Sequence, residues 1–195
     1  MYAYLVFAAV CLLGVSAQEP QRCVSPPVWT AKLFEIDSRR TFDVFANITY
    51  DATNQRIRID ESIDNFTNPT RDYFDTFFFF KEKMMYIVNL TSKECKKRDL
   101  PDDIVFHPVG IPPDARPLGE AVIGSNAGIK IGVTVDLWSG TSPRGGRYMG
   151  VWTSVGCIPV SELHRLESGD ILRQSFYDVA LGDVPERFIP PSNCQ

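Results

Sequence analysis

This chain of 195 residues has few histidines, no excess of positive charge and no long hydrophobic run. It has two histidines, and its 20 basic and 24 acidic residues give a formal net charge of −4. Proteins that bind nucleic acids need a basic surface, so no nucleic-acid partner is expected. No apolar run approaches the roughly 20 residues of a membrane-spanning helix, so no membrane span is expected either.

Sequence motifs of common catalytic and metal sites are also absent. The chain has no GxSxG, HExxH or P-loop motif, and its two histidines, His107 and His164, stand alone. A hydrolase stays as an alternative, because the members of a catalytic triad need not be close in sequence. The acidic segment from Asp60 to Asp64 lacks the glycine and the bidentate glutamate that a calcium loop requires. We therefore expect no enzymatic activity and no cofactor, and we assign no metal ligands.

The first apolar segment has the features of a cleaved secretion signal. Residues 5–15 (LVFAAVCLLGV) are too few to cross a membrane. Val15 and Ala17 supply the small residues that signal peptidase requires, which predicts a signal peptide over residues 1–17. Asn-X-Thr triplets, which accept N-linked glycans in the secretory pathway, begin at Asn47, Asn65 and Asn89. The mature chain is therefore predicted to be a secreted, extracellular glycoprotein.

The cysteines of the mature chain favour disulfide bonds over a metal site. Cys11 leaves with the signal peptide, and the other four are Cys23, Cys95, Cys157 and Cys194. Zinc sites usually take their ligands in closely spaced pairs, and these cysteines form none. An even number of cysteines in a secreted chain predicts two disulfides. Three connectivities stay open, because the spacing does not select among them.

Apolar and polar residues alternate with a period of two, which predicts a β-dominated, antiparallel single domain over residues 18–195. In residues 41–50 the even positions are apolar, and Asn47 lies on the opposite face. A hairpin is predicted for residues 73–80 and 84–90. Another is predicted between residues 129–137 and the strand at 147–153.

Two further segments have a different pattern. Residues 100–117 contain five prolines, which lack the amide donor of a β-ladder. This predicts an extended, irregular segment that crosses the molecule. Residues 159–166 predict a short helix with Ser161 as its cap, and residues 171–179 predict another strand.

The predicted hairpin over residues 73–90 is apolar on both faces, so each face needs a cover. A second sheet, a partner subunit or an apolar ligand would each serve. If the loop at 139–146 closes symmetrically, Leu137 lies opposite Tyr148 and Val135 opposite Gly150. Large side chains then alternate with glycine and leave concave space beside the rings. The same pattern also fits rings that fill a sandwich core, and the pattern alone favours the filled core.

Short motifs occur in a fixed order along nearly the whole mature chain. They are CVSPPVW from Cys23, YD from Tyr50, RIR from Arg56, FKE from Phe80, CKK from Cys95, IGS from Ile123, WSG from Trp138, GCIPV from Gly156, SFYD from Ser175, and FIPP from Phe188 with Cys194 behind it. Each motif is weak alone, but their order and the four-cysteine frame together are specific. In this combination the chain resembles the ependymin-related family.

The resemblance implies a secreted or lysosomal glycoprotein. Its strands would form two curved antiparallel sheets, a half-barrel around an apolar cavity that is similar to bacterial lipoprotein carriers. The implied disulfides are Cys23–Cys157 and Cys95–Cys194. Calcium-dependent behaviour, a homodimer and contact with extracellular-matrix components are implied as well.

With this resemblance, a cavity replaces the filled core as our expectation. We expect it to bind a fatty acyl chain or another lipid without catalysis. The alternative is an adhesion or signalling glycoprotein that acts through its surface and carries no lipid. The side chains expected to line the cavity are Phe42, Val44, Phe77, Phe79, Tyr86, Val88, Val133, Val135, Leu137, Tyr148 and Trp152.

Overall fold

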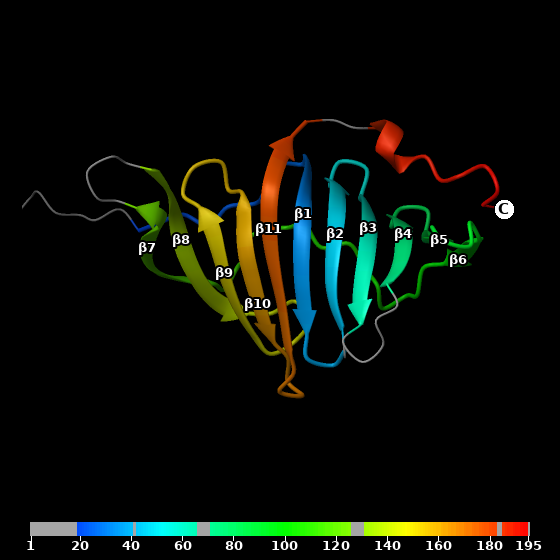
Figure 1. Cartoon of the computed structure of the whole chain (residues 1–195). Helices are drawn as coiled ribbons and strands as arrows, with labels where there is room; N and C mark the ends of the chain where they lie inside the picture. Colours follow the sequence, from blue (N-terminus) through cyan, green and yellow to red (C-terminus); the bar gives the residue numbers. More distant parts are fainter. Residues whose placement is uncertain (1–18, 41, 66–70, 126–130, 183–184, 195) are drawn as a thin grey trace, which may run out of the picture.

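The computed structural model describes residues 19–40, 42–65, 71–125, 131–182 and 185–194. In this part of the chain, eleven strands form one antiparallel sheet in the order β6-β5-β4-β3-β2-β1-β11-β10-β9-β8-β7 (Figure 1). The strands are β1 (Val28–Asp37), β2 (Phe42–Asp51), β3 (Arg56–Asn65), β4 (Arg71–Phe79), β5 (Met84–Asn89), β6 (Cys95–Asp99), β7 (Arg116–Ser125), β8 (Ile131–Thr141), β9 (Arg147–Thr153), β10 (Pro159–Arg165) and β11 (Ile171–Leu181). A short 3₁₀-helix, η1 (Pro185–Phe188), follows β11.

The first and last strands pair at the centre of the sheet. β1 and β11 are antiparallel, from the pair Trp29↔Leu181 to the pair Asp37↔Leu172, with a bulge between Thr30 and Lys32. The two halves of the chain extend outward from this pair as meanders, so β6 and β7 become the opposite edges. The sheet is therefore completed by residues far apart in sequence.

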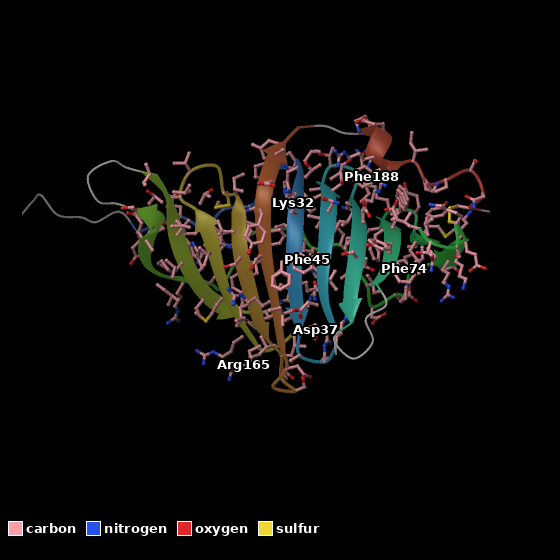
Figure 2. All side chains as sticks on the ribbon, in the orientation of Figure 1. Lys32, Asp37, Phe45, Phe74, Arg165 and Phe188 are labelled. Carbon is pink, nitrogen blue, oxygen red and sulfur yellow. A yellow bond between two sulfur atoms is a disulfide. The ribbon has the colours of Figure 1, made fainter. Side chains whose placement is uncertain are left out.

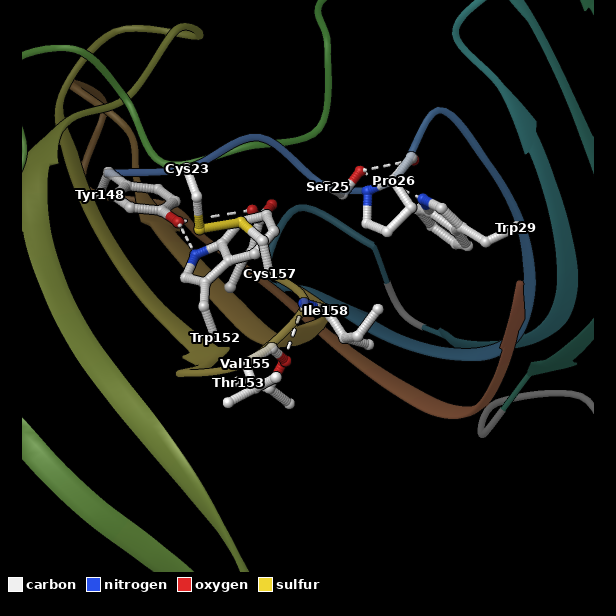
Figure 3. The surroundings of a disulfide bond; sticks show 11 residues. Cys23, Ser25, Pro26, Trp29, Tyr148, Trp152, Thr153, Val155, Cys157 and Ile158 are labelled. Carbon is white, nitrogen blue, oxygen red and sulfur yellow. Dashed lines mark hydrogen bonds between the residues drawn. A yellow bond between two sulfur atoms is a disulfide. The ribbon is translucent and has the colours of Figure 1, made fainter. Parts of the chain in front are cut away.

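β2 illustrates how alternation gives the sheet two different faces. Its even-numbered side chains Val44, Ala46, Ile48 and Tyr50 are buried, whereas Phe45 and Asn47 are exposed. We call the face that carries Tyr50 the inner face and the face that carries Phe45 the outer face. The sheet curves around the inner face, and Figure 3 shows strands on either side of the Cys23–Cys157 disulfide.

The predicted proline-rich crossing is present and connects the two edges of the sheet. Residues 100–115 pass behind the sheet in Figure 1, on its inner face. The amides of Ser25 and Ile111 form backbone hydrogen bonds with Val109 and Cys23, at 2.9 and 3.0 Å. The hydroxyl of Tyr50 accepts a hydrogen bond of 3.0 Å from the amide of Val109. These bonds fasten the crossing segment to the N-terminal segment and to Tyr50, and it lies outside the named strands of the sheet.

Two clusters of buried side chains fill much of the space between the inner face and the crossing segment. The first centres on Trp29, which stacks on Tyr50 with ring centroids 4.9 Å apart and meets Phe176 edge to face at 5.9 Å. The second contains Trp138, Tyr148 and Trp152 together with Ile111, Ala115 and Cys157. Val109 of the crossing segment packs against both clusters.

The C-terminal segment covers the outer face of β3 to β6. The guanidinium of Arg56 lies 4.2 Å from the ring centroid of the buried Phe188. Arg58 forms an ion pair of 2.8 Å with Asp75 and donates a hydrogen bond of 2.9 Å to the carbonyl of Arg187. Because this cover and the inner core enclose β4 and β5 from both sides, these strands are apolar on both faces.

The all-β, antiparallel and curved architecture is confirmed, with two differences from the expectation. One continuous sheet replaces the two expected sheets, because β1 and β11 join the two halves. Residues 159–165 form β10 and not a short helix. Pairing with both β9 and β11 gives β10 two ladders, which outweigh a single helical turn capped by Ser161.

Candidate functional site

A cavity of about 310 Å³ lies between the inner face and the crossing segment. Strands from both halves of the sheet form one wall, and residues of the crossing segment form the opposite wall. Its lining residues are Trp29, Leu33, Ile48, Ile57, Ile59, Phe78, Phe80, Ile104, Val105, His107, Pro108, Val109, Gly110, Pro112, Pro143, Arg144, Tyr148, Glu162, His164, Gln174 and Phe176.

One end of the cavity is apolar, and strand register explains why. Ile57 pairs with Phe78 across β3 and β4, and Ile48 pairs with Ile59 across β2 and β3. Cross-strand partners point to the same face, so these side chains form a continuous apolar wall. Phe80 extends this wall and stacks on Phe78 at 6.1 Å. This end offers a water-excluding surface to an aliphatic chain.

The other end of the cavity is polar and hydrogen-bonded. The hydroxyl of Ser142 and Nδ1 of His164 are 2.9 Å apart, and Nε2 of His164 lies 3.5 Å from the Glu162 carboxylate. Tyr148 donates to Glu162 at 3.5 Å and accepts a bond of 2.7 Å from the indole of Trp152. Burial, followed by the nearby carboxylate, raises the pKa of Tyr148, so its hydroxyl stays protonated. Together the two ends suit a ligand that has an aliphatic part and a polar part.

Contacts with Ser142 and Glu162 orient the ring of His164, which lines the cavity. Ser142 is buried and is not among the lining residues. Its hydroxyl also accepts a hydrogen bond of 3.1 Å from the amide of Arg144, within the turn between β8 and β9. His107 lines the cavity from the crossing segment and belongs to a different element.

The described part of the chain contains no group of three or more His, Cys, Asp or Glu side chains placed to hold a metal ion. The calcium expectation therefore receives no support from these residues. None of the described helices is long and apolar enough to cross a membrane.

The structure joins Cys23 to Cys157 and Cys95 to Cys194, which are the two pairs that the resemblance implies. The first bridge lies beside the second core cluster, where the Trp152–Tyr148 hydrogen bond is visible (Figure 3). The second fastens the C-terminal segment to β6 on the outer face. Each bridge therefore ties chain ends to the sheet.

Most of the predicted pocket residues do not line the cavity. Tyr148 does, whereas Val44 and Trp152 are buried in the core clusters of the inner face. The side chain of Phe42 lies outside the described part. The other predicted residues lie on the face of their strands opposite the cavity.

Strand parity accounts for this placement in two parts of the sheet. In β4 and β5 the residues Phe77, Phe79, Tyr86 and Val88 belong to the outer face, since their neighbours Phe78 and Ile57 point into the cavity. In β8 the residues Val133, Val135 and Leu137 lie opposite the inner face, because Gly140 pairs with Tyr148 and Trp138 pairs with Gly150. The turn between β8 and β9 is shorter than predicted, and this shifts the register by an odd number of residues.

Sequence analysis also missed residues that do line the cavity. Phe78, Phe80, Ile57 and Ile59 carried a clear alternation, and only the choice of face was missing. Glu162, His164 and Gln174 had no such signal, since a helix was predicted for the first two and the third is an isolated polar residue in a strand. Their juxtaposition comes from the register of β10 and β11.

The sequons are distributed over the outer face and a turn. Asn47 is exposed on the outer face of β2. Asn89 is half-buried, and its side-chain oxygen accepts hydrogen bonds of 2.9 and 2.8 Å from the amides of Thr91 and Ser92. The side chain of Asn65 and the predicted signal peptide lie outside the described residues.

Comparison with known proteins identifies the family. The Ependymin family model matches residues 68–194. An ependymin from Notemigonus crysoleucas is 30% identical over 193 residues, covering 98% of this chain and 87% of that protein. Mammalian ependymin-related protein 1 from Mus musculus is 29% identical over 192 residues, covering 95% of this chain and 83% of that protein. The chain belongs to the ependymin family.

Solved structures add information on the fold alone. An uncharacterised conserved protein from Thermus thermophilus is similar with a TM-score of 0.55 at 11% identity, covering 86% of this chain and 88% of that chain. A LolA superfamily protein from Nitrosomonas europaea aligns with a TM-score of 0.31 at 9% identity, over 84% of this chain and 89% of that chain. We draw no conclusion from the second similarity, because its TM-score is below 0.5.

Proposed function

We propose that this protein is a secreted glycoprotein that binds a hydrophobic ligand, a fatty acyl chain or another lipid, in its inner cavity without catalysis. The cavity of about 310 Å³ carries the proposal. Ligand pockets typically measure about 300–1,000 Å³ and combine apolar walls with a few polar groups. The isoleucine and phenylalanine wall and the Tyr148–Glu162–His164 end meet both criteria.

The energetics of such binding are favourable for a single acyl chain. Each buried methylene contributes about 0.8 kcal/mol, so ten of them contribute about 8 kcal/mol. Association costs at least about 4 kcal/mol, and a micromolar Kd corresponds to about 8 kcal/mol of net binding free energy. Contacts at the polar end of the cavity would supply part of the further free energy that a micromolar Kd requires. The size of the cavity favours a single-chain ligand over a bulky one.

The test is to secrete the full chain from a glycosylating host, extract it with organic solvent and identify lipid by mass spectrometry. Titration with a fluorescent fatty acid then measures binding. Ile59→Trp places a large ring inside the cavity and should reduce affinity at least tenfold, while Ile189→Trp, at an exposed C-terminal position, should not. Thermal unfolding of both variants shows whether they fold. A folded protein that yields no lipid and ignores the fatty acid would contradict the proposal.

The secretion part of the proposal has its own measurement. Cleavage after Ala17 predicts that the mature protein begins at Gln18, which N-terminal sequencing of the secreted material can read. A protein that keeps residues 1–17 or stays inside the cell would refute this part and leave lipid binding to be judged separately.

A second candidate function acts through the surface, by adhesion to matrix components, by signalling or by homodimer formation. The observation in its favour is a row of exposed apolar side chains on β7, β8 and β9. It comprises Leu118, Ile123, Ile131, Val133 and Met149, which are 47–70% exposed. Exposed apolar surface of this kind often marks an interaction site. Ile131→Ser with Val133→Ser should then reduce self-association or matrix adhesion and leave fatty-acid binding unchanged.

A further inference from the structure

The outer face carries a shallow aromatic groove that is unrelated to the inner cavity. It has a volume of about 500 Å³ and extends over β1 to β4 and β11. Its aromatic side chains are Phe34, Phe45, Tyr73 and Tyr177, and three of them are 41–54% exposed. Figure 2 shows the ring of Phe45 over the front of the sheet. Several exposed aromatic rings in one groove indicate that another chemical group covers them in the functional protein.

A glycosylation acceptor lies inside this groove. Asn47 is one of its lining residues, and the triplet Asn47, Ile48 and Thr49 is a complete sequon. Phe45 and Asn47 are two positions apart on β2, so their side chains leave the same face about 7 Å from each other. The ring of Phe45 stacks on Phe34, its cross-strand partner, with ring centroids 4.6 Å apart and an interplanar angle of 28°. A sugar attached to Asn47 therefore begins within reach of the exposed face of a stacked ring.

We propose that Asn47 carries an N-linked glycan and that the first sugar of this glycan packs on the ring of Phe45. Transfer from a lipid-linked oligosaccharide diphosphate forms a bond between Nδ2 of Asn47 and C1 of the first N-acetylglucosamine. The bond from C1 to the diphosphate breaks, and the proton from Nδ2 leaves with the diphosphate group. Thr49 is buried in the folded protein, so transfer takes place on the unfolded nascent chain. The proposal relies on the proposed export of the chain and is independent of lipid binding.

The chemistry of the groove fits a sugar. One face of a pyranose ring presents C–H groups, which carry partial positive charge and pack on the electron-rich face of an aromatic ring. The rim supplies polar partners, because Asp60 and Lys32 are the cross-strand neighbours of Asn47. Lys32 forms an exposed ion pair of 2.6 Å with Asp178, which leaves its other N–H groups for hydroxyl oxygens. A glycan anchored here would also cover the exposed rings and keep a second copy of the chain from packing on them.

The test uses a protein in which Asn47 is the only acceptor. Thr67→Ala and Thr91→Ala remove the other two sequons. This protein is made in three forms: fully glycosylated from a eukaryotic host, trimmed to one sugar by an endoglycosidase, and unglycosylated from a bacterial periplasm that forms disulfides. Intact mass gives the occupancy of Asn47, and thermal unfolding gives Tm.

We expect Asn47 to be occupied in the secreted protein. The full and the one-sugar forms should have the same Tm, about 2–4 °C above that of the unglycosylated form. In a Phe45→Ser background the three forms should have equal Tm values, because the sugar has lost its ring. Phe45 is largely exposed, so this variant keeps its core.

Three results would overturn the proposal. If Asn47 is unmodified in the secreted protein, no glycan is present to pack on Phe45. A gain in Tm that persists in Phe45→Ser shows that the sugar acts without the ring. A glycosylated dimer that dissociates on Phe45→Ser shows that a second copy of the chain covers the groove. Fatty-acid titration of the same preparations keeps any failure of lipid binding separate.

Discussion

Gly150 is the position where a single methyl group should disturb both the core and the cavity. A Cβ added to Gly150 would overlap the hydroxyl of Tyr148 and lie 2.7 Å from the indole nitrogen of Trp152. Both rings are almost completely buried, so neither can move aside without repacking the second core cluster. Gly150→Ala should therefore break the Trp152–Tyr148 hydrogen bond and strain the packing around it.

The lost hydrogen bond and the strained packing together determine how far the free energy of unfolding falls. Leaving the buried indole donor unpaired costs about 1–3 kcal/mol, and inserting a methyl group into a packed core costs about 1–3 kcal/mol. The free energy of unfolding should fall by about 2–5 kcal/mol, which lowers the urea midpoint by about 1–2 M. Tyr148→Phe should reproduce the hydrogen-bond part alone. Met149→Ala, at the exposed neighbouring position, is the control and should change little.

Urea unfolding followed by fluorescence and by near-ultraviolet circular dichroism measures these changes. Fatty-acid binding should also weaken in Gly150→Ala, because Tyr148 forms part of the polar end of the cavity. A variant that unfolds within about 0.5 kcal/mol of the wild type, the ordinary range for surface substitutions, would refute the packing described for Tyr148 and Trp152.

Two further predictions concern acid stability and the outer disulfide. Burial alone would raise the pKa of Asp51, but hydrogen bonds from Asn54 and Arg56 hold this pKa below its usual value of 3.8. A carboxyl group whose pKa is lower in the folded state than in the unfolded state stabilises the fold at higher pH, and this stability is lost as the pH falls through the pKa of the folded state. Asp51→Asn removes this group and should therefore flatten the decline in unfolding free energy below about pH 4. Replacing Cys95 and Cys194 together by serine should remove up to about 4–5 kcal/mol, since the bridge closes 99 residues. Because this bridge lies on the outer face, fatty-acid binding measured at a temperature where the variant is folded should stay unchanged.

The hairpins could be predicted from sequence where local alternation and local turns determine them. β2 and β3 carry a clear period of two, and their turn is fixed by the carboxylate of Asp51. The pattern assigned no strand to β1 or β7. β7 is mostly exposed on both faces and contains Pro117 and Gly119 at a bulge, so it lacks the alternation of a half-buried strand. Its pairing with β8 supplies what the pattern does not show.

The sequence alone could not determine which face of each strand lines the space under the crossing segment. Alternation separates the two faces of β4, but both faces are apolar, so the choice between Phe77 and Phe78 depends on what covers each one. The crossing segment and the C-terminal segment decide this, and both are brought there by long-range contacts and disulfides. The polar end depends in the same way on the register of β10, which local propensity does not determine.

Pairing of β1 with β11 has a consequence for biosynthesis. While the polypeptide is being made, β1 has an open edge until almost the entire sequence has been translated, roughly 10–30 s at usual elongation speeds. An unpaired strand edge exposes backbone N–H and C=O groups that can pair with other chains and lead to aggregation. Closure between remote segments is also slow, because loop entropy is lost before any contact forms. Newly made molecules therefore expose this edge for an interval in which other chains can pair with it. Once formed, the two disulfides cross-link residues on either side of the β1–β11 pair and oppose its separation.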